Sequence, residues 1–194
     1  MVAEKLTKKS LSRAVEVLNN GGVVICPTDT VYGFLADAGN KKAVEKIYKI
    51  KKRPKSKPLP IFVKDLKMAK ELEEIDEKFD KILIKKWPGK YTFVLKRKKM
   101  SEVGPHSKFY GVDEETIALR IPKYKFLNYL LEKIDKPLAQ TSVNISGKET
   151  LTKISDIINQ FSKFDILIID GGNLKKSKPS KIVDLSGEQL TRIR

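Results

Sequence analysis

The sequence predicts an α/β domain in which one mixed, twisted β-sheet of about seven strands carries helices in layers on both faces. Five to seven segments with helical spacing of apolar residues interleave with about seven short apolar runs. The two kinds of segment neither alternate strictly nor separate into halves, which favours a three-layer α/β or α+β arrangement. Because the 194 residues contain no repeat or low-complexity linker, we expect one domain over residues 1–194.

Start and stop signals place the elements of the first half. Residues 10–20 favour a helix that Ser10 caps and Gly21 closes. A second helix is expected from the N-cap Asn40 to Arg53. The other elements expected here are a buried strand at 23–26, an extended run at 58–63, helices at 65–72 and from 76 to 87, and a strand at 91–95.

In the second half, residues 100–115 have no period and are expected to form a loop. This loop contains His106, to which we assign no catalytic role. Residues 116–121 favour a strand with Ile117 and Leu119 on one face and Arg120 on the other. Further elements are expected as helices at 126–134 and 154–161, strands at 137–141 and 164–169, and strand-like pieces at 180–185 and 190–194.

Composition excludes several classes of site. The 40 basic and 24 acidic residues give a net charge of +16, which favours a polyanionic ligand, although lysine-rich surfaces and thermophile proteins share this balance. Cys26 and His106 are the only residues of their types, so a disulfide framework, a thiolate metal cage and an ordinary zinc site are not expected. We see no signal peptide and no run long enough to span a membrane, so we expect a cytoplasmic protein.

Two stretches contain polar residues that no core requires. The loop 28–33 offers hydroxyls, a carboxylate and a glycine at the end of a buried strand, which is enough to line a small-molecule pocket. Lys51 falls on the apolar stripe of its helix, and Arg53 and Lys57 follow at the helix C-terminus. Any one of these cations is typical of a solvated helix end, but the three together favour anion binding.

A second polar motif follows the strand at 137–141. Alternation places Ser142, Asn144 and Ser146 on one side, as expected for an edge that faces a ligand. An Asx or serine turn is the alternative interpretation for any one of them. Arg120, at the end of its strand, is a candidate for gripping a carboxylate at two points.

These residues belong to a set of ordered motifs that resembles the YrdC-like threonylcarbamoyl-AMP synthases. The motifs are Pro27-Thr28-Asp29-Thr30-Val31-Tyr32-Gly33, Lys51-Lys52-Arg53-Pro54 with Lys57-Pro58-Leu59, Pro88-Gly89 with Thr92, Arg120-Ile121-Pro122, Ser142-Val143-Asn144 with Ser146-Gly147, and Pro179-Ser180 with Ile182-Val183-Asp184. The resemblance runs from about residue 10 to residue 194 and implies the short, single-domain form with a YrdC/RibB-like fold.

Membership would imply a nucleotidyltransferase that converts L-threonine, bicarbonate and ATP, with Mg²⁺, to threonylcarbamoyl-AMP and pyrophosphate. A separate transferase would then use the product to form N6-threonylcarbamoyladenosine in tRNA. Neutralising the charge of the carbamate and the pyrophosphate suits cations and Mg²⁺ rather than a Ser or Cys nucleophile. No protein-held metal cluster is expected.

The resemblance also implies roles for individual residues. The catalytic set, which would grip the phosphates and the carbamate, is Lys51, Arg53, Ser142 and Asn144. The nucleotide would contact Arg53, Lys57, Thr116, Ser142, Thr150 and Arg194. The threonine would contact Thr30, Arg120 and Ser180, with Arg120 taking its carboxylate. Phe62 departs from the pattern, because many members have a histidine there that touches threonine.

Two other functions stay open. The first is a module that binds double-stranded RNA or tRNA and aids ribosome maturation, which suits the net charge and the basic run Lys96–Lys99. Aromatic residues are not interleaved with the basic clusters, which disfavours single-strand reading. The second is a carbamoyl-adenylate domain of the hydrogenase-maturation type, although the zinc-finger and acylphosphatase regions that would accompany it are not present in this sequence.

Overall fold

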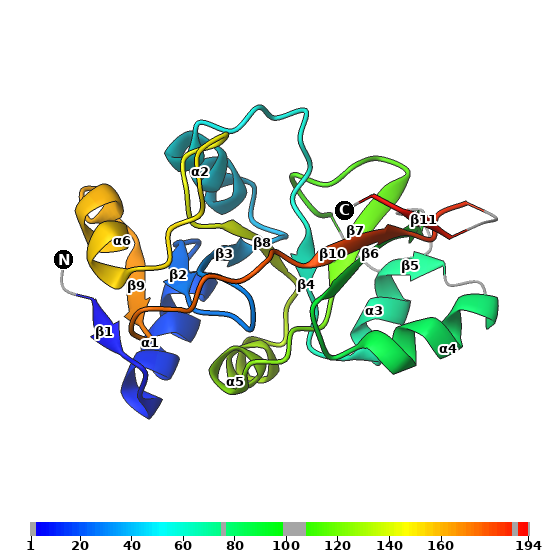
Figure 1. Cartoon of the computed structure of the whole chain (residues 1–194), viewed down its shortest axis with the longest axis horizontal. Coiled ribbons are helices and arrows are strands. Elements are labelled where there is room, and N and C mark those ends of the chain that lie inside the picture. Colours follow the sequence, from blue (N-terminus) through cyan, green and yellow to red (C-terminus); the bar gives the residue numbers. More distant parts are fainter. Residues whose placement is uncertain (1–2, 75–76, 99–107, 188–189, 194) are drawn as a thin grey trace.

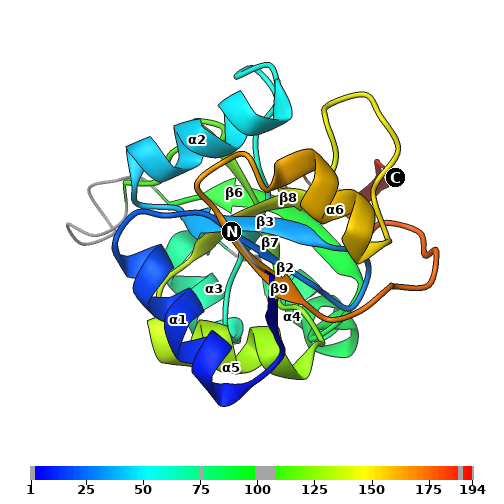
Figure 2. The same ribbon diagram turned by 90° about the vertical axis from the view of Figure 1, so that its left-hand side faces the viewer.

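The structure, a computed structural model, describes residues 3–74, 77–98, 108–187 and 190–193 (Figure 1). A twisted mixed sheet forms the middle layer. In the side view, helices α2 (Lys41–Lys51) and α6 (Ile154–Phe161) lie on one side of the sheet, and α1 (Lys8–Asn19) and α5 (Lys125–Ile134) lie on the other (Figure 2). The predicted three-layer fold is therefore confirmed.

The sheet contains eleven strands among the described residues, in the order β1-β9-β2-β3-β8-β4-β7-β6-β10-β11, with β5 paired to β6. Their bounds are β1 Glu4–Lys5, β2 Val24–Cys26, β3 Gly33–Asp37, β4 Ile61–Phe62, β5 Glu73–Glu74, β6 Tyr91–Arg97, β7 Thr116–Arg120, β8 Leu138–Ser142, β9 Leu167–Asp170, β10 Lys181–Asp184 and β11 Thr191–Arg192. The prediction of about seven strands was too low. The strands that were not expected are β1, β3 and β5. β1 and β5 have two residues each, too few for a period-2 pattern, and β3 is buried on both faces, so its residues do not alternate.

Buried side chains form two cores, one on each face of the sheet. The larger core receives residues from α2, α6 and the remaining helices α3 (Leu66–Leu72) and α4 (Glu77–Lys86). The smaller core lies under α1 and α5. Along β7, Ile117 and Leu119 belong to the larger core, as the alternation predicts, while the side chain of Arg120 takes the opposite face beside Phe62 of the smaller core.

Helix ends follow capping chemistry with one correction. Thr7, not Ser10, is the N-cap of α1. Its hydroxyl accepts from the backbone N–H of Ser10, and the Ser10 hydroxyl accepts in return from the backbone N–H of Thr7, which makes a reciprocal capping box. Asn40 caps α2 as predicted, and the helix ends where Lys52 turns left-handed at φ 50°.

Strand register brings the two polar motifs of the sequence together. β3 and β8 pair antiparallel with Gly33 opposite Ser142, so the loop before β3 meets the loop after β8. β4 lies between β8 and β7 and sets Phe62 beside Arg120. Residues about one hundred positions apart in the sequence therefore share one region of the sheet.

In the part of the chain that the structure describes, no helix combines the length and apolar character that a membrane span requires.

Glu73 is an ionisable group in an unusual place. It is 1% exposed at the start of β5, and neither carboxylate oxygen has a hydrogen-bond partner among the described residues. Burial raises the pKa of Glu73 to about 8, and Lys98 and Lys70 only partly oppose this increase. The side chain is therefore mostly protonated at neutral pH.

We expect the free energy of unfolding to fall as the pH rises from the unfolded pKa, about 4.3, to the folded value near 8. In this window the folded state keeps a proton that the unfolded chain releases, so the slope can approach about 1.4 kcal/mol per pH unit. Urea unfolding of wild type and Glu73→Gln between pH 5 and 9 measures it. The variant should lose this slope, whereas the exposed control Glu132→Gln should keep it; equal slopes in wild type and Glu73→Gln would contradict the assignment.

Candidate active site

Two polar clusters lie where the loops before β3 and after β8 meet. The lysine cluster consists of Lys51, Ser142 and Asn144. The arginine cluster consists of Asp29, Thr30 and Arg120. The backbone N–H of Val143, in the loop of the lysine cluster, donates to the carbonyl of Tyr32, two residues after Thr30, at 2.9 Å. The two clusters are therefore neighbours.

Lys51 joins the C-terminal end of α2 to the end of β8. Its side chain is buried, and its ammonium donates to the carbonyl oxygens of Ser142 and Asn144 and to Oδ1 of Asn144, at 2.5, 2.8 and 3.0 Å. These three acceptors match the three N–H bonds of the ammonium group. In return, the backbone carbonyl of Lys51 accepts from the N–H of Ser146 at 2.8 Å. Lys51 therefore holds the loop 142–146 through both its side-chain ammonium and its backbone carbonyl.

The charge on Lys51 has no carboxylate partner among the ion pairs of the described residues. Burial lowers the pKa of Lys51 to about 7, and the nearby Arg53 adds to this decrease. The ammonium also lies 5.5 Å from the centroid of the Phe34 ring, a contact that favours its charged form. Lys51 is consequently a cation that titrates near neutral pH.

Ser142 and Asn144 are oriented by each other. The Ser142 hydroxyl lies 2.8 Å from Asn144 Oδ1, and Asn144 Nδ2 donates to the carbonyls of Ile145 and Lys148 at 3.0 and 2.7 Å. β8 ends at Ser142, so the alternation expected through Ser146 stops there. The local turn and the cluster with Lys51 coexist, because one Asn144 side chain makes both sets of contacts.

Arg53 closes the turn that follows α2. Its Nε donates to the carbonyl of Lys57 at 3.1 Å and its Nη2 to the carbonyl of Pro58 at 2.9 Å. Burial lowers the pKa of Arg53, and Tyr48 partly counters this effect. The side chain of Lys57 is exposed at the outer end of the same turn.

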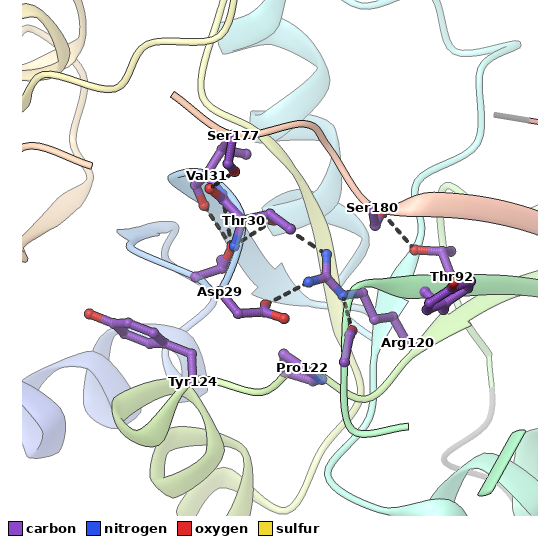
Figure 3. A network of polar contacts seen from close by, with 12 residues as sticks. Asp29, Thr30, Val31, Thr92, Arg120, Pro122, Tyr124, Ser177 and Ser180 are labelled. Carbon is purple, nitrogen blue, oxygen red and sulfur yellow. Dashed lines mark hydrogen bonds and ion pairs between the residues drawn. The ribbon is translucent and has the colours of Figure 1, made fainter. Parts of the chain in front are cut away.

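Arg120 is the centre of the arginine cluster (Figure 3). It is 2% exposed, and its Nη2 lies 2.5 Å from Asp29 Oδ1 in a buried ion pair. Its Nε donates to the carbonyl of Gly89 at 3.0 Å, and its Nη1 reaches the Thr30 hydroxyl at 3.4 Å. Burial lowers the pKa of Arg120 and Asp29 raises it. The guanidinium carbon lies 5.5 Å from the centroid of the Phe62 ring, a cation–π contact.

Hydroxyl groups hold the loop that contains Asp29 and Thr30. The Thr28 hydroxyl bonds the Thr30 hydroxyl, the carbonyl of Val31 and the N–H groups of both residues at 2.7 to 3.3 Å. The segment between β9 and β10 crosses the sheet above this loop (Figure 1), and its Ser177 hydroxyl donates to the Thr30 carbonyl at 2.5 Å. Further along that segment, Ser180 pairs with Thr92 at 3.0 Å. Ser180 thus lies beside Arg120 (Figure 3).

The remaining predicted residues lie outside the two clusters. Thr116 begins β7, and its hydroxyl and N–H both bond Asp113 Oδ1 in a local turn. Thr150 has no contact of its own described, but the N–H of the next residue, Leu151, bonds the Val143 carbonyl at 2.9 Å, which keeps Thr150 near the lysine cluster. Arg194, His106 and Lys99 lie outside the described residues.

From the sequence we gave no individual role to Asp29, which belongs to the arginine cluster, or to Ser177 and the Gly89 carbonyl, which contact it. Asp29 had a usable signal, since it is the one carboxylate in the hydroxyl-rich loop. Ser177 and Gly89 had none, because each reaches the cluster through a long-range contact. Among the described residues, no group of three or more His, Cys, Asp or Glu side chains could hold a metal ion.

The chain is similar to known proteins in sequence and in fold. A protein-family model, Sua5_yciO_yrdC, with the description "Telomere recombination", matches residues 16–194. A relative from Methanocaldococcus jannaschii is 36% identical over 98% of this chain and 87% of its own length. Relatives named threonylcarbamoyl-AMP synthase from Pyrococcus abyssi and Bacillus subtilis are each 33% identical over 95% and 84% of this chain. The chain spans about half of those two proteins, 53% and 46%.

Solved structures give the same result. A crystal structure of P. abyssi Sua5 complexed with L-threonine matches with a TM-score of 0.87 at 28% identity, covering 100% of this chain and 57% of that one. E. coli YciO matches with a TM-score of 0.85 at 27% identity, covering 100% and 95%. Full-length HypF shares the fold alone, with a TM-score of 0.81 at 17% identity over 95% of this chain and 28% of that one. By the match over residues 16–194 and these relatives, the chain belongs to the Sua5/YciO/YrdC family.

Proposed function

We propose that this chain is a threonylcarbamoyl-AMP synthase, which joins L-threonine, bicarbonate and ATP and releases pyrophosphate and water. One observation carries the proposal: the Lys51 ammonium bonds the backbone of Ser142 and Asn144 directly beside a cluster built on Arg120. The name of the relatives and the threonine complex of P. abyssi Sua5 support the choice of substrate.

The chemistry suits these groups. A carbamate oxygen that attacks the α-phosphate brings negative charge to a group that is already negative, and pyrophosphate leaves with more. Fixed cations and hydrogen-bond donors lower that barrier, and no covalent nucleophile is needed. An acyl-adenylate hydrolyses in water, so an enclosed site also helps.

On the nucleotide side we assign the phosphates to Arg53 and to the Ser142 hydroxyl, which would redirect its one O–H from Asn144 Oδ1 to a phosphate oxygen. Lys51 acts differently from the simple grip that the sequence resemblance implies. Because its three N–H bonds are already engaged, it is a positioning residue that orients Ser142 and Asn144 and adds a positive potential to the site. We also propose that the nucleotide contacts Lys57, Thr116, Thr150 and Arg194.

On the amino acid side, Arg120 takes the threonine carboxylate. A guanidinium has five N–H bonds, and three contacts to described residues engage three of them, one on each nitrogen. Each terminal nitrogen therefore keeps one N–H, enough for a two-point contact to a carboxylate. Thr30 and Ser180 present hydroxyls on the same side for the rest of the amino acid.

The described residues offer no ligand set for Mg²⁺, so we derive no step through it; when bound with ATP it would supply charge to the phosphates. We further propose that residues 1–194 form one domain, that the protein works in the cytoplasm, and that a separate tRNA threonylcarbamoyl transferase consumes the product. We assign no site for bicarbonate and no base for the threonine amine.

A coupled assay tests the function. With pyrophosphatase present, phosphate release should require ATP, bicarbonate and L-threonine together, because pyrophosphate leaves only when all three react. Threonine-independent release would contradict the proposal. Absence of any release combined with tight, steeply salt-dependent RNA binding would instead favour the RNA-binding module.

Arg53→Ala should lower turnover by an amount equivalent to about 2 to 4 kcal/mol, because a charge-assisted contact to the reacting phosphates is lost. Steady-state kinetics in the same assay measures the change. Lys55→Ala is the matched control, since Lys55 lies on the same turn but pairs with Glu45 in solvent. Turnover of Arg53→Ala close to that of Lys55→Ala would exclude the role.

Nucleotide affinity should fall as the pH rises through about 7, because Lys51 loses its charge there. The decrease should approach about tenfold per pH unit at most. At pH 6 the Lys51→Gln variant should bind ATP more weakly than the wild type, and its affinity should not change as the pH passes through 7. Lys49 lies on the exposed side of α2, so Lys49→Gln should show the wild-type pH dependence. Calorimetric titration with ATP from pH 6 to 8.5 measures all three proteins, and the titration of ATP itself is common to them. A wild-type profile identical to that of Lys51→Gln would contradict this assignment.

A further inference from the structure

Asp29 is the one carboxylate of the arginine cluster, and one of its two oxygen atoms has no hydrogen-bond partner among the described residues. Its side chain is 7% exposed, and Oδ1 lies 2.5 Å from Arg120 Nη2. The other oxygen, Oδ2, is buried and has no hydrogen-bond partner among the described residues. Figure 3 shows the carboxylate below the Thr30 loop, between that loop and the guanidinium. A buried carboxylate oxygen without a donor is costly and requires an explanation.

Loop geometry does not explain Asp29. An aspartate in a tight loop usually accepts from a backbone N–H two residues further on. Here Thr28 performs that function, since its hydroxyl accepts from the N–H groups of Thr30 and Val31. The Asp29 carboxylate accepts only from Arg120 in the contacts described. Its place in the loop therefore serves the cluster rather than the backbone.

Neutralising Arg120 does not explain it fully either. A buried ion pair is favourable only where the remaining lone pairs of the carboxylate are satisfied, and here Oδ2 is not. Arg120 already donates to the Gly89 carbonyl and makes a cation–π contact with Phe62. The pair is thus held in an arrangement that an incoming hydrogen-bond donor would improve.

An α-amino acid brings the two groups that complement this pair. Its carboxylate and its ammonium lie on one carbon atom, opposite in charge, as do the guanidinium and the carboxylate here. We propose that Asp29 recognises the α-ammonium group of the amino acid substrate while Arg120 takes its carboxylate. This inference rests on the proposed function and specifies how its amino acid is selected.

The proposal involves an exchange of hydrogen-bond partners. Because Oδ2 is enclosed, the Asp29 side chain turns toward the substrate when the ammonium arrives, and its contact to Arg120 Nη2 loosens. The N–H that is released becomes available to the substrate carboxylate. One internal ion pair is replaced by two, and Asp29 occupies Arg120 only while the amino acid is absent.

Three ligands distinguish recognition of the ammonium group by Asp29 from a role of Asp29 in supporting the fold. L-Threonine carries both charges, 3-hydroxybutyrate lacks the ammonium, and 1-aminopropan-2-ol lacks the carboxylate. Their dissociation constants are measured by NMR titration with wild type, Asp29→Asn and Asp29→Glu. Asp37→Asn is the matched control, because it removes an ion-paired carboxylate at the opposite end of β3. Thermal unfolding of each variant checks its fold.

Asp29→Asn should weaken threonine binding about tenfold or more, since a charge-assisted hydrogen bond is lost. It should leave 3-hydroxybutyrate binding unchanged or tighter, because Arg120 is no longer occupied. Asp29→Glu should keep the preference for threonine over 3-hydroxybutyrate, and Asp37→Asn should behave as the wild type.

Equal weakening of threonine and 3-hydroxybutyrate in Asp29→Asn would mean that Asp29 only supports the fold, and would overturn this inference alone. Unchanged threonine binding would overturn it as well. A wild type that does not bind threonine under any condition would overturn the proposed function first, and this inference with it.

Discussion

The buried ammonium group of Lys51 is the contact on which the site depends. A helix end, a strand end and the loop after that strand converge on one nitrogen atom, and three oxygens from two residues satisfy it. Because these oxygens belong to Ser142 and Asn144, the contact also fixes the two polar side chains that face the site. A neutral side chain of similar length could fill the space but could not bind three acceptors at once.

The two cations of the site are stabilised in opposite ways. Among the described residues, the partners of Lys51 are neutral oxygens and an aromatic face, so burial lowers its pKa to about 7. Arg120 keeps its charge beside Asp29 because guanidinium holds its proton far more strongly than an amine. The charge of Lys51 therefore responds to pH near neutrality, whereas the charge of Arg120 does not.

Local signals made most of the fold predictable from the sequence. The stripe Val44, Ile47 and Tyr48 places α2, and Asn40 sets its first turn, as the structure confirms. The alternation of Ile117 and Leu119 correctly gave the two faces of β7. Strands β1, β3 and β5 and the capping role of Thr7 were missed, because a two-residue pairing, a strand buried on both faces and a shifted cap leave no alternating pattern in the sequence.

The sequence by itself determined which side chains are available: a lysine on an apolar stripe, a carboxylate among threonines and an arginine at a strand end. Only the tertiary structure decided their partners. Sheet pairing set Gly33 opposite Ser142 and brought Asp29 within 2.5 Å of Arg120. Contacts between residues some ninety positions apart follow from strand order and register, which depend on the packing of the whole sheet and not on any short stretch of residues.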